Sequence, residues 1–405
     1  MVQDKHTLNA FKNLATQALA CKEKPIKKHE EWRHSDLKLL EMGNSTIKTI
    51  DEKVFLSLDE RCYNVFLVNG KLDKDKSILP KVGVRIYEAN DQEFIDELFK
   101  IDLKNGFDNK YQVLQSYSKM KYGILINITQ DLDKPLKICY FNTGNHHITF
   151  VKIGKEAGAK LYEEFVQYGD RQGYLDQVTK IELSENSTCK HFKQHNFTGG
   201  VHFLYSSKIV CKEYSQYDNY MLNMGCKSYR QDVECYLQGK RASGNFYGVA
   251  IGKGQETYNM VLKIEHQSSY TTSTQHYNQV LADKSHGSFI GNTKILKFLN
   301  GVKACQLNKN LLLDKKAKAF SKPELDIHSD DVVCSHGATV GSIDEDTVYY
   351  LKSRGIDKQT AEKLIVQGFL KAVFEDKGLE SEDYKRLTHQ IANHTSDSHI
   401  KVQID

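Results

Sequence analysis

The pattern of apolar and polar residues changes twice along the chain. The apolar residues near its start recur at helical spacing: Leu8, Phe11, Leu14, Ala15, Ala18 and Leu19. Pro25 follows the end of this pattern, where a helix often stops. From about Val54 the pattern becomes mixed, and residues 65–68 predict a strand that runs into a turn. We therefore expect a helical region over residues 1–53 and a mixed α/β entry over residues 54–135.

Short β-rich segments dominate residues 136–342, and many of them alternate apolar and polar residues. No proline occurs between Pro135 and Pro323. Strands that are bonded on both sides require this, because proline lacks the donor for the ladder. Two architectures fit: a sandwich or barrel of antiparallel hairpins, and a parallel β-helix with stacked turns of roughly 20 residues. Hairpin turns of the Asn-Gly or Asp-Gly type are scarce, which favours the β-helix.

From Ile343 the pattern is helical again. Asp344 and Asp357 are suited to cap two helices, and a third helix begins at about Ser381. We expect a C-terminal helical region over residues 343–405 that either caps the β unit or presents a groove or ridge to a partner helix. The predicted fold class is mainly β: a β-helix core over residues 54–342, flanked by N-terminal and C-terminal α-helical regions.

Composition excludes several classes of protein. The 56 basic and 52 acidic residues give a net charge of +4, which is too balanced to indicate a nucleic-acid partner. No segment has the ~18 apolar residues of a membrane helix, and the start shows no apolar leader. The nine cysteines are scattered without a C-x-x-C spacing, which argues against a disulfide framework and a self-contained zinc site. We expect a cytoplasmic protein with free thiols.

The segment over residues 330–341 carries Cys334 and His336, two residues apart. In an extended strand such residues leave the same face. Thiolate and imidazole both suit iron, zinc and iron–sulfur clusters. Two ligands do not fill a four-ligand site, so a second chain or a distant segment would have to complete it. A buried cysteine beside a turn histidine fits the same spacing, and the pattern leaves both interpretations open.

Familiar catalytic motifs are missing from the sequence. Residues 248–254 do not match a phosphate-binding loop, and neither H-E-x-x-H nor G-x-S-x-G occurs. His146 and His147 would point to opposite faces of a strand, and we expect them to be a surface pair.

The C-terminal half resembles the SufB/SufD family of iron–sulfur cluster assembly proteins. The order and spacing match over four segments: residues 306–313, 323–327, 330–341 and 349–356. Three upstream segments also fit: residues 30–33, 271–275 and 287–291. The intact C-S-H-G-A-T-V-G motif is the form of the SufD branch, and residues 314–318 lack the cysteine that SufB-type chains carry after the Asn-rich motif.

This resemblance implies a right-handed parallel β-helix in a non-catalytic scaffold subunit. The subunit would pair with SufB through the β-helix core and bind one SufC ATPase through its C-terminal helices. His336 would serve a transient iron–sulfur cluster at the SufB interface, with Cys334 beside it, and no cluster would stay tightly bound to the isolated chain. The candidate SufC-binding residues are Tyr349, Tyr350, Leu351, Arg354, Leu364, Ile365 and Phe369.

Two alternatives stay open at this point. One is a SufB-like primary cluster scaffold that acts as a homodimer with SufC; a homodimer is also possible for the isolated chain. The other is a β-helix carbohydrate-active enzyme, for which secretion and an acidic groove would be expected.

Overall fold

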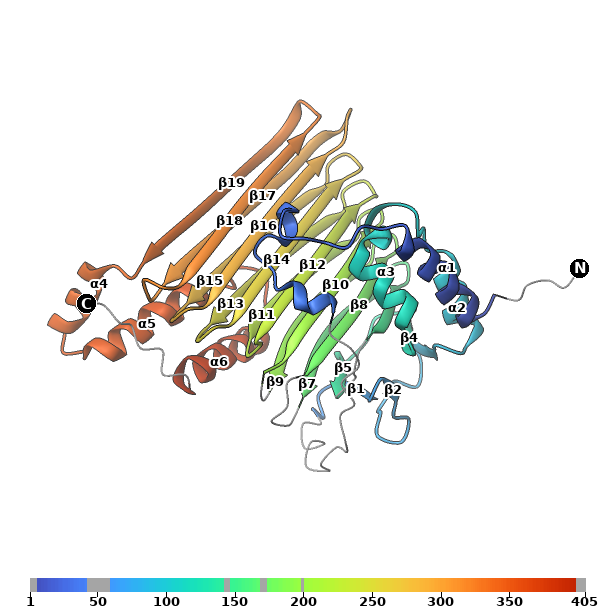
Figure 1. The fold of residues 1–405 in the computed structure, drawn as a ribbon, viewed down its shortest axis with the longest axis horizontal. Helices are drawn as coiled ribbons and strands as arrows, with labels where there is room; N and C mark the ends of the chain where they lie inside the picture. The colour runs from blue at the N-terminus through green and yellow to red at the C-terminus, as the bar shows by residue number, and fades with distance from the viewer. Residues whose placement is uncertain (1–5, 42–58, 142–145, 168–172, 198–199, 398–405) are drawn as a thin grey trace, which may run out of the picture.

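The computed structural model describes residues 6–41, 59–141, 146–167, 173–197 and 200–397. Two long sheets wind around a shared interior as a parallel β-helix, and helices lie at both ends (Figure 1). The prediction of a parallel β-helix is confirmed, and the alternative of a sandwich or barrel of hairpins is not found among the described strands. The predicted boundary between residues 53 and 54 lies outside the described residues.

The described strands form one ten-stranded and one nine-stranded sheet. In chain order, the ten-stranded sheet contains β1 (Tyr63–Val68), β2 (Lys71–Leu72), β5 (Leu136–Phe141), β7 (Gly158–Gln167), β9 (Thr188–Phe197), β11 (Gln216–Met224), β13 (Ser243–Gly252), β15 (Thr272–Leu281), β17 (Asn300–Leu312) and β19 (Asp331–Ser342). The nine-stranded sheet contains β3 (Val84–Glu88), β4 (Tyr122–Ile128), β6 (His147–Ile153), β8 (Tyr174–Leu183), β10 (His202–Cys211), β12 (Ser228–Leu237), β14 (Thr257–His266), β16 (His286–Ile295) and β18 (Lys318–Ile327).

Successive strands alternate between the two sheets, so that one turn of the β-helix contributes one strand to each. Neighbouring turns pair in parallel, and β1–β2 and β3–β4 are the antiparallel exceptions among the described strands. Thr257 pairs with His286, which lies 29 residues later. The expected turn of roughly 20 residues is therefore too short, because each turn holds two strands of about ten residues and two corners.

The interior of the β-helix is filled by side chains that alternate with outward-facing ones. Its middle is apolar and aromatic: Phe165 stacks on Tyr140 with ring centroids 4.5 Å apart and contacts Phe203 at 4.9 Å. Towards the last turns the interior becomes polar, and Gln275 and Gln306 are buried there. The two ends of the interior thus differ in chemistry.

The N-terminal helices close the first turns. α1 (Leu8–Ala20), α2 (Gln92–Phe99) and α3 (Tyr111–Lys119) share an apolar cluster with β4, β6 and β8. The short helices η1 (Glu30–Trp32), η2 (Leu37–Leu40) and η4 (Gly106–Asn109) also lie on this side. In particular, Trp32 is buried against the outer face of the nine-stranded sheet, in one cluster with Tyr174 and Leu204.

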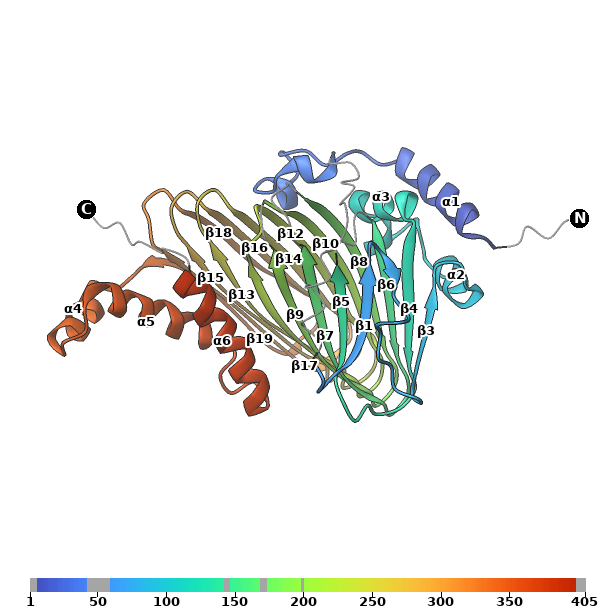
Figure 2. The ribbon, with the colours of Figure 1, turned by 90° about the horizontal axis from the view of Figure 1, so that it is seen from below.

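The C-terminal helices cover the outer face of the ten-stranded sheet, opposite the N-terminal segment (Figure 2). These are α4 (Glu345–Ser353), α5 (Lys358–Lys371) and α6 (Ser381–Asp397). The predicted caps are confirmed: Asp344 accepts hydrogen bonds from two backbone N–H groups of α4, and Asp357 accepts one from Thr360. No helix in the described part of the chain is long and apolar enough to cross a membrane.

A column of aromatic side chains supports these helices. The rings of Tyr162, Phe192, Tyr220 and Tyr247 stack on four consecutive turns, with centroids 5.0, 4.8 and 5.5 Å apart. The column belongs to the same apolar cluster as the buried residues of α5 and α6. Because the strands pair in regular register, these rings form a continuous surface on which the C-terminal helices pack.

Candidate functional site

The last turn of the β-helix ends in two strands that are each paired on one side only within the described residues. β19 pairs with β17, and β18 pairs with β16 (Figure 1). Over its 12 residues β19 contains no Lys, Arg or Pro, whereas β18 contains Pro323. The side chains of Val333 and Val340 on β19 are 69% and 52% exposed. A long strand edge without lysine, arginine or proline is open to pairing with another chain.

Cys334 and His336 lie on the inner side of β19. In the parallel register Cys334 pairs with Ala304 and His336 pairs with Gln306. Ala304 and Gln306 are buried, whereas Cys305 between them is exposed. Residues in register on neighbouring strands share a face. Both candidate ligands therefore lie at the open end of the interior, and Cys305 is on the opposite face of the sheet.

The two side chains differ in their surroundings. Cys334 is half-buried, and burial raises the pKa of its thiol, opposed by a smaller effect from the backbone of Ala304. The thiol must lose a proton before it can bind a metal, so binding and deprotonation are coupled. His336 is exposed, and its imidazole forms no hydrogen bond to a described residue. It is free to bind a ligand.

The last turn supplies two candidate ligands, a thiol and an imidazole, and not a complete metal site. No group of three or more His, Cys, Asp or Glu side chains among the described residues is arranged to hold a metal ion. An iron–sulfur cluster at this position would need further ligands from a second chain.

A polar column lies in the interior directly behind His336. Gln275, Gln306 and His336 occupy the same register position on β15, β17 and β19. Gln275 and Gln306 both donate to the hydroxyl of Thr293, over 3.1 and 2.7 Å. Sequence analysis missed this column, because its members become neighbours only when the length of each turn is known.

A second polar group that sequence analysis missed lies deeper in the interior. Glu163 is 2% exposed and accepts hydrogen bonds from Tyr140 and Tyr205, over 2.9 and 2.8 Å. Burial favours its neutral form, but hydrogen bonds from His191 and Tyr205 and the charged groups nearby together outweigh burial and lower the pKa of Glu163. Burial also lowers the pKa of Lys193 to about 7, and its Nζ lies 3.8 Å from the centre of the Tyr205 ring. These groups satisfy one another and stabilise the interior.

The prediction that His146 and His147 form a surface pair is wrong. They are 3% and 2% exposed, and His146 Nδ1 lies 2.6 Å from the carboxylate of Asp176. The reason is that β6 is buried on both faces, by the interior on one side and by the cluster around α3 on the other. Alternation along a strand does not reveal whether its second face is covered.

The seven candidate partner-binding residues fall into two groups. Tyr349, Tyr350 and Leu364 are 74%, 56% and 47% exposed on α4 and α5. Arg354 is also exposed, and its guanidinium lies 5.3 Å from the centre of the Tyr350 ring. The other three are half-buried and pack against the core of the helical region: Leu351, Ile365 and Phe369. The exposed group offers an apolar surface with one cation.

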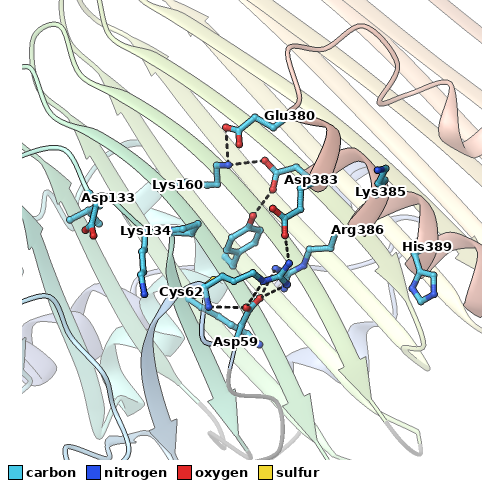
Figure 3. A pocket seen from close by; sticks show the side chains of 16 residues that line it. Asp59, Cys62, Asp133, Lys134, Lys160, Glu380, Asp383, Lys385, Arg386 and His389 are labelled. Carbon is cyan, nitrogen blue, oxygen red and sulfur yellow. Dashed lines mark hydrogen bonds and ion pairs between the residues drawn. The ribbon is translucent and has the colours of Figure 1, made fainter.

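A hollow of about 1050 Å³ lies between α6 and the first turns of the ten-stranded sheet (Figure 3). Charged side chains line it, and many of them are paired across it. Asp383 is 2% exposed and accepts hydrogen bonds from Tyr162 and Lys160, over 2.5 and 2.9 Å. Arg61 pairs with Glu382. These contacts join residues that are far apart in sequence. We interpret the hollow as the contact region that attaches α6 to the ten-stranded sheet.

Comparisons with known proteins agree with this geometry. The model of the SufBD core domain of SUF-system iron–sulfur cluster assembly matches residues 140–369, more than half of the chain. "Iron-sulfur cluster assembly protein SufD" of Escherichia coli (strain K12) is 24% identical over 387 residues, which cover 91% of this chain and 89% of that protein.

Two proteins of Bacillus subtilis (strain 168) are similar over shorter parts. The one named "Iron-sulfur cluster assembly protein SufD" is 34% identical over 144 residues, 36% of this chain and 33% of its own length. The one named "Iron-sulfur cluster assembly protein SufB" is 24% identical over 282 residues, 67% of this chain and 60% of its own length. On the match over residues 140–369, this chain belongs to the SufB/SufD family of the SUF iron–sulfur cluster assembly system.

Proposed function

We propose that this chain is a non-catalytic scaffold subunit of the SufD type in the cytoplasm. It pairs with a SufB protein along β19, and the nascent iron–sulfur cluster, as cargo, is built at the seam. The observation that carries the proposal is that Cys334 and His336 both face inward on an unprotected edge strand. A near full-length similarity to a protein named SufD supports it.

Pairing with a partner strand would explain why β19 leaves one edge unpaired and why two of its valines are exposed. A partner strand would satisfy the free backbone groups of β19 and cover Val333 and Val340, which are now 69% and 52% exposed. The same partner would close the open end of the interior. Cys334 and His336 would then lie between the two subunits, where the partner can contribute the remaining ligands.

The exposed surface of α4 and α5 is the proposed binding site for the SufC ATPase. Tyr349, Tyr350 and Leu364 provide apolar contact area that the fold of this chain does not use. Arg354 adds a cation beside Tyr350. Aromatic residues and arginine are the types that dominate binding energy at protein interfaces.

Native mass spectrometry of the chain co-expressed with its cognate SufB and SufC tests the assembly. We expect one SufB, one copy of this chain and two SufC. A Val333→Lys/Val340→Lys variant places charges on the edge and should lose SufB but keep SufC. A Tyr349→Ala/Leu364→Ala variant should do the reverse. A homodimer that carries SufC and excludes SufB would contradict the proposal and favour the SufB-like alternative.

The cluster site needs a separate test with a matched control. His336→Ala and Cys334→Ser in the intact complex should each lower the yield of cluster, measured by visible absorbance and iron content. Cys305→Ser removes a thiol from the other face of the neighbouring strand and should leave the yield unchanged. Equal effects of Cys305→Ser and Cys334→Ser would show that the face of β19 is irrelevant.

A further inference from the structure

Three large side chains occupy strained positions in one column at a corner of the β-helix. Tyr214, Arg241 and Tyr270 have φ angles of 56°, 60° and 62°, in the left-handed region that bulky residues rarely adopt. Each is locked by a hydrogen bond from its backbone N–H to a carbonyl of the next corner: Lys240, Ser269 and Asn300 respectively. Glycine or asparagine would suit such positions better, and Asn186 occupies the corner before Tyr214.

The three side chains form a sandwich on the surface. The guanidinium carbon of Arg241 lies 5.8 Å from the ring centres of both Tyr214 and Tyr270. The Nζ of Lys240 lies 5.3 Å from the centre of the Tyr270 ring. Because the rings would contact the two faces of the guanidinium, its N–H donors at the planar edge stay available to a ligand. Tyr214 and Tyr270 are 49% and 45% exposed, so the sandwich is not part of the core.

The charge of this corner is not neutralised within the described chain. Lys240, Arg241 and Lys297 are exposed, and none of them forms an ion pair with a described residue. Phe298 beside them is 92% exposed. The turns around Tyr214, Arg241, Tyr270 and Phe298 contain one acidic residue, Glu213. An exposed cationic and aromatic surface of this kind is complementary to an acidic partner.

We propose that the Tyr214–Arg241–Tyr270 sandwich, with Lys240 and Lys297, is a docking surface for an acidic segment of a partner protein. Its carboxylates would take the outward N–H donors of Arg241 in a bidentate pair. Stacking of single-stranded nucleic acid on Tyr270 is a poorer fit, because it needs free ring faces. Tyr270 has Arg241 on one side, and on the next turn the backbone of Gly301 packs so closely that a Cβ there would lie 2.6 Å from the ring.

The surface is separate from the proposed SufB and SufC contacts but leads towards the cluster edge. The same column continues through Gly301, whose N–H donates to the Asp331 carboxylate at the start of β19. With ~4.8 Å between turns, Arg241 is three turns, or roughly 14 Å, from β19. An acidic protein bound here would reach the last turn of the β-helix. The inference does not depend on whether SufB pairs with β19.

Isothermal titration calorimetry of the full chain with hexaglutamate tests the proposal, with hexaglutamine and a six-nucleotide oligothymidylate as comparison ligands. We expect salt-sensitive binding of hexaglutamate and no binding of hexaglutamine. Arg241→Lys keeps the charge but loses the planar fork, and should weaken binding ~10-fold. A Tyr214→Gly/Tyr270→Gly variant should weaken it similarly while relieving the left-handed strain, so that loss of folding is not the cause.

Asn186→Gly is the matched control, because it changes the equivalent corner position one turn away and should bind as the unaltered chain does. Equal affinity of Arg241→Lys and the unaltered chain would overturn the proposal, since simple positive charge would then suffice. Tighter binding of oligothymidylate than of hexaglutamate, lost in the same variants, would also overturn it. So would the absence of hexaglutamate binding at millimolar concentration.

Discussion

Arg230 offers a strong test of how the N-terminal segment is held. Its side chain is fully buried on β12 and pairs bidentately with Asp232, over 2.7 and 2.8 Å. It also donates to the carbonyl of Glu31 and the hydroxyl of Ser35, over 2.5 and 2.6 Å. The guanidinium carbon lies 3.7 Å from the centre of the Trp32 ring. One side chain thus joins η1 and its neighbours to the β-helix.

We expect Arg230→Met to destabilise the attachment by about 3–5 kcal/mol, because it leaves the carboxylate of Asp232 buried without its partner. Asp232→Leu should destabilise the attachment by a similar amount, because it leaves the guanidinium of Arg230 buried without its carboxylate partner. The double variant should recover most of the loss, since it removes both buried charges. Hydrogen-exchange mass spectrometry of residues 29–40 and urea unfolding measure the local and global effects.

Lys263→Met is the control for this experiment. Lys263 pairs with Glu31 in the same region, but the two side chains are 34% and 36% exposed. An exposed pair contributes at most about 1 kcal/mol. The reasoning is refuted if Arg230→Met costs no more than Lys263→Met, or if the double variant is as unstable as either single variant.

Two further predictions concern the attachment of α6 to the ten-stranded sheet and the buried carboxyl group of Glu256. Asp383→Leu should free α6 and speed hydrogen exchange there, with β12 unaffected as the internal reference, because Tyr162 and Lys160 lose their buried acceptor; unchanged exchange in α6 would contradict this. Burial raises the pKa of Glu256 to about 7. The stability that its neutral form contributes is present below the unfolded pKa near 4.5 and is lost as the pH rises through 7, by roughly 1–3 kcal/mol. Glu256→Gln should flatten this part of the urea-unfolding profile between pH 5 and 8, and an unchanged slope would argue against it.

Relationships within one strand could be predicted from the sequence, whereas relationships between turns could not. The shared face of Cys334 and His336 follows from the two-residue period of a strand. The β-rich tract followed from alternation and from the position of proline, and the scarcity of hairpin turns favoured a β-helix over a sandwich. Pro323 lies in the edge strand β18.

Contacts between turns depend on the length of each turn, and this length varies. Ser228 follows its partner His202 by 26 residues, whereas Lys318 follows His286 by 32. A fixed repeat therefore could not place Gln275 and Gln306 behind His336, or Tyr205 beside Glu163. The contact of Asp383 with Lys160 spans 223 residues and has no local signal at all.

The N-terminal segment also changes how the β-helix is expected to unfold. A stack of turns in which each touches only its neighbours can fray from either end. Here Glu30 pairs with Lys322 on β18 over 2.6 Å, and His34 stacks on Phe320 of the same strand, while Arg230 holds the segment on β12. Residues that are synthesised early are thus tied to β18, the last strand of the nine-stranded sheet. Fraying of the last strand of the nine-stranded sheet is therefore coupled to release of the N-terminal segment, and the full set of contacts forms only after synthesis has passed residue 322.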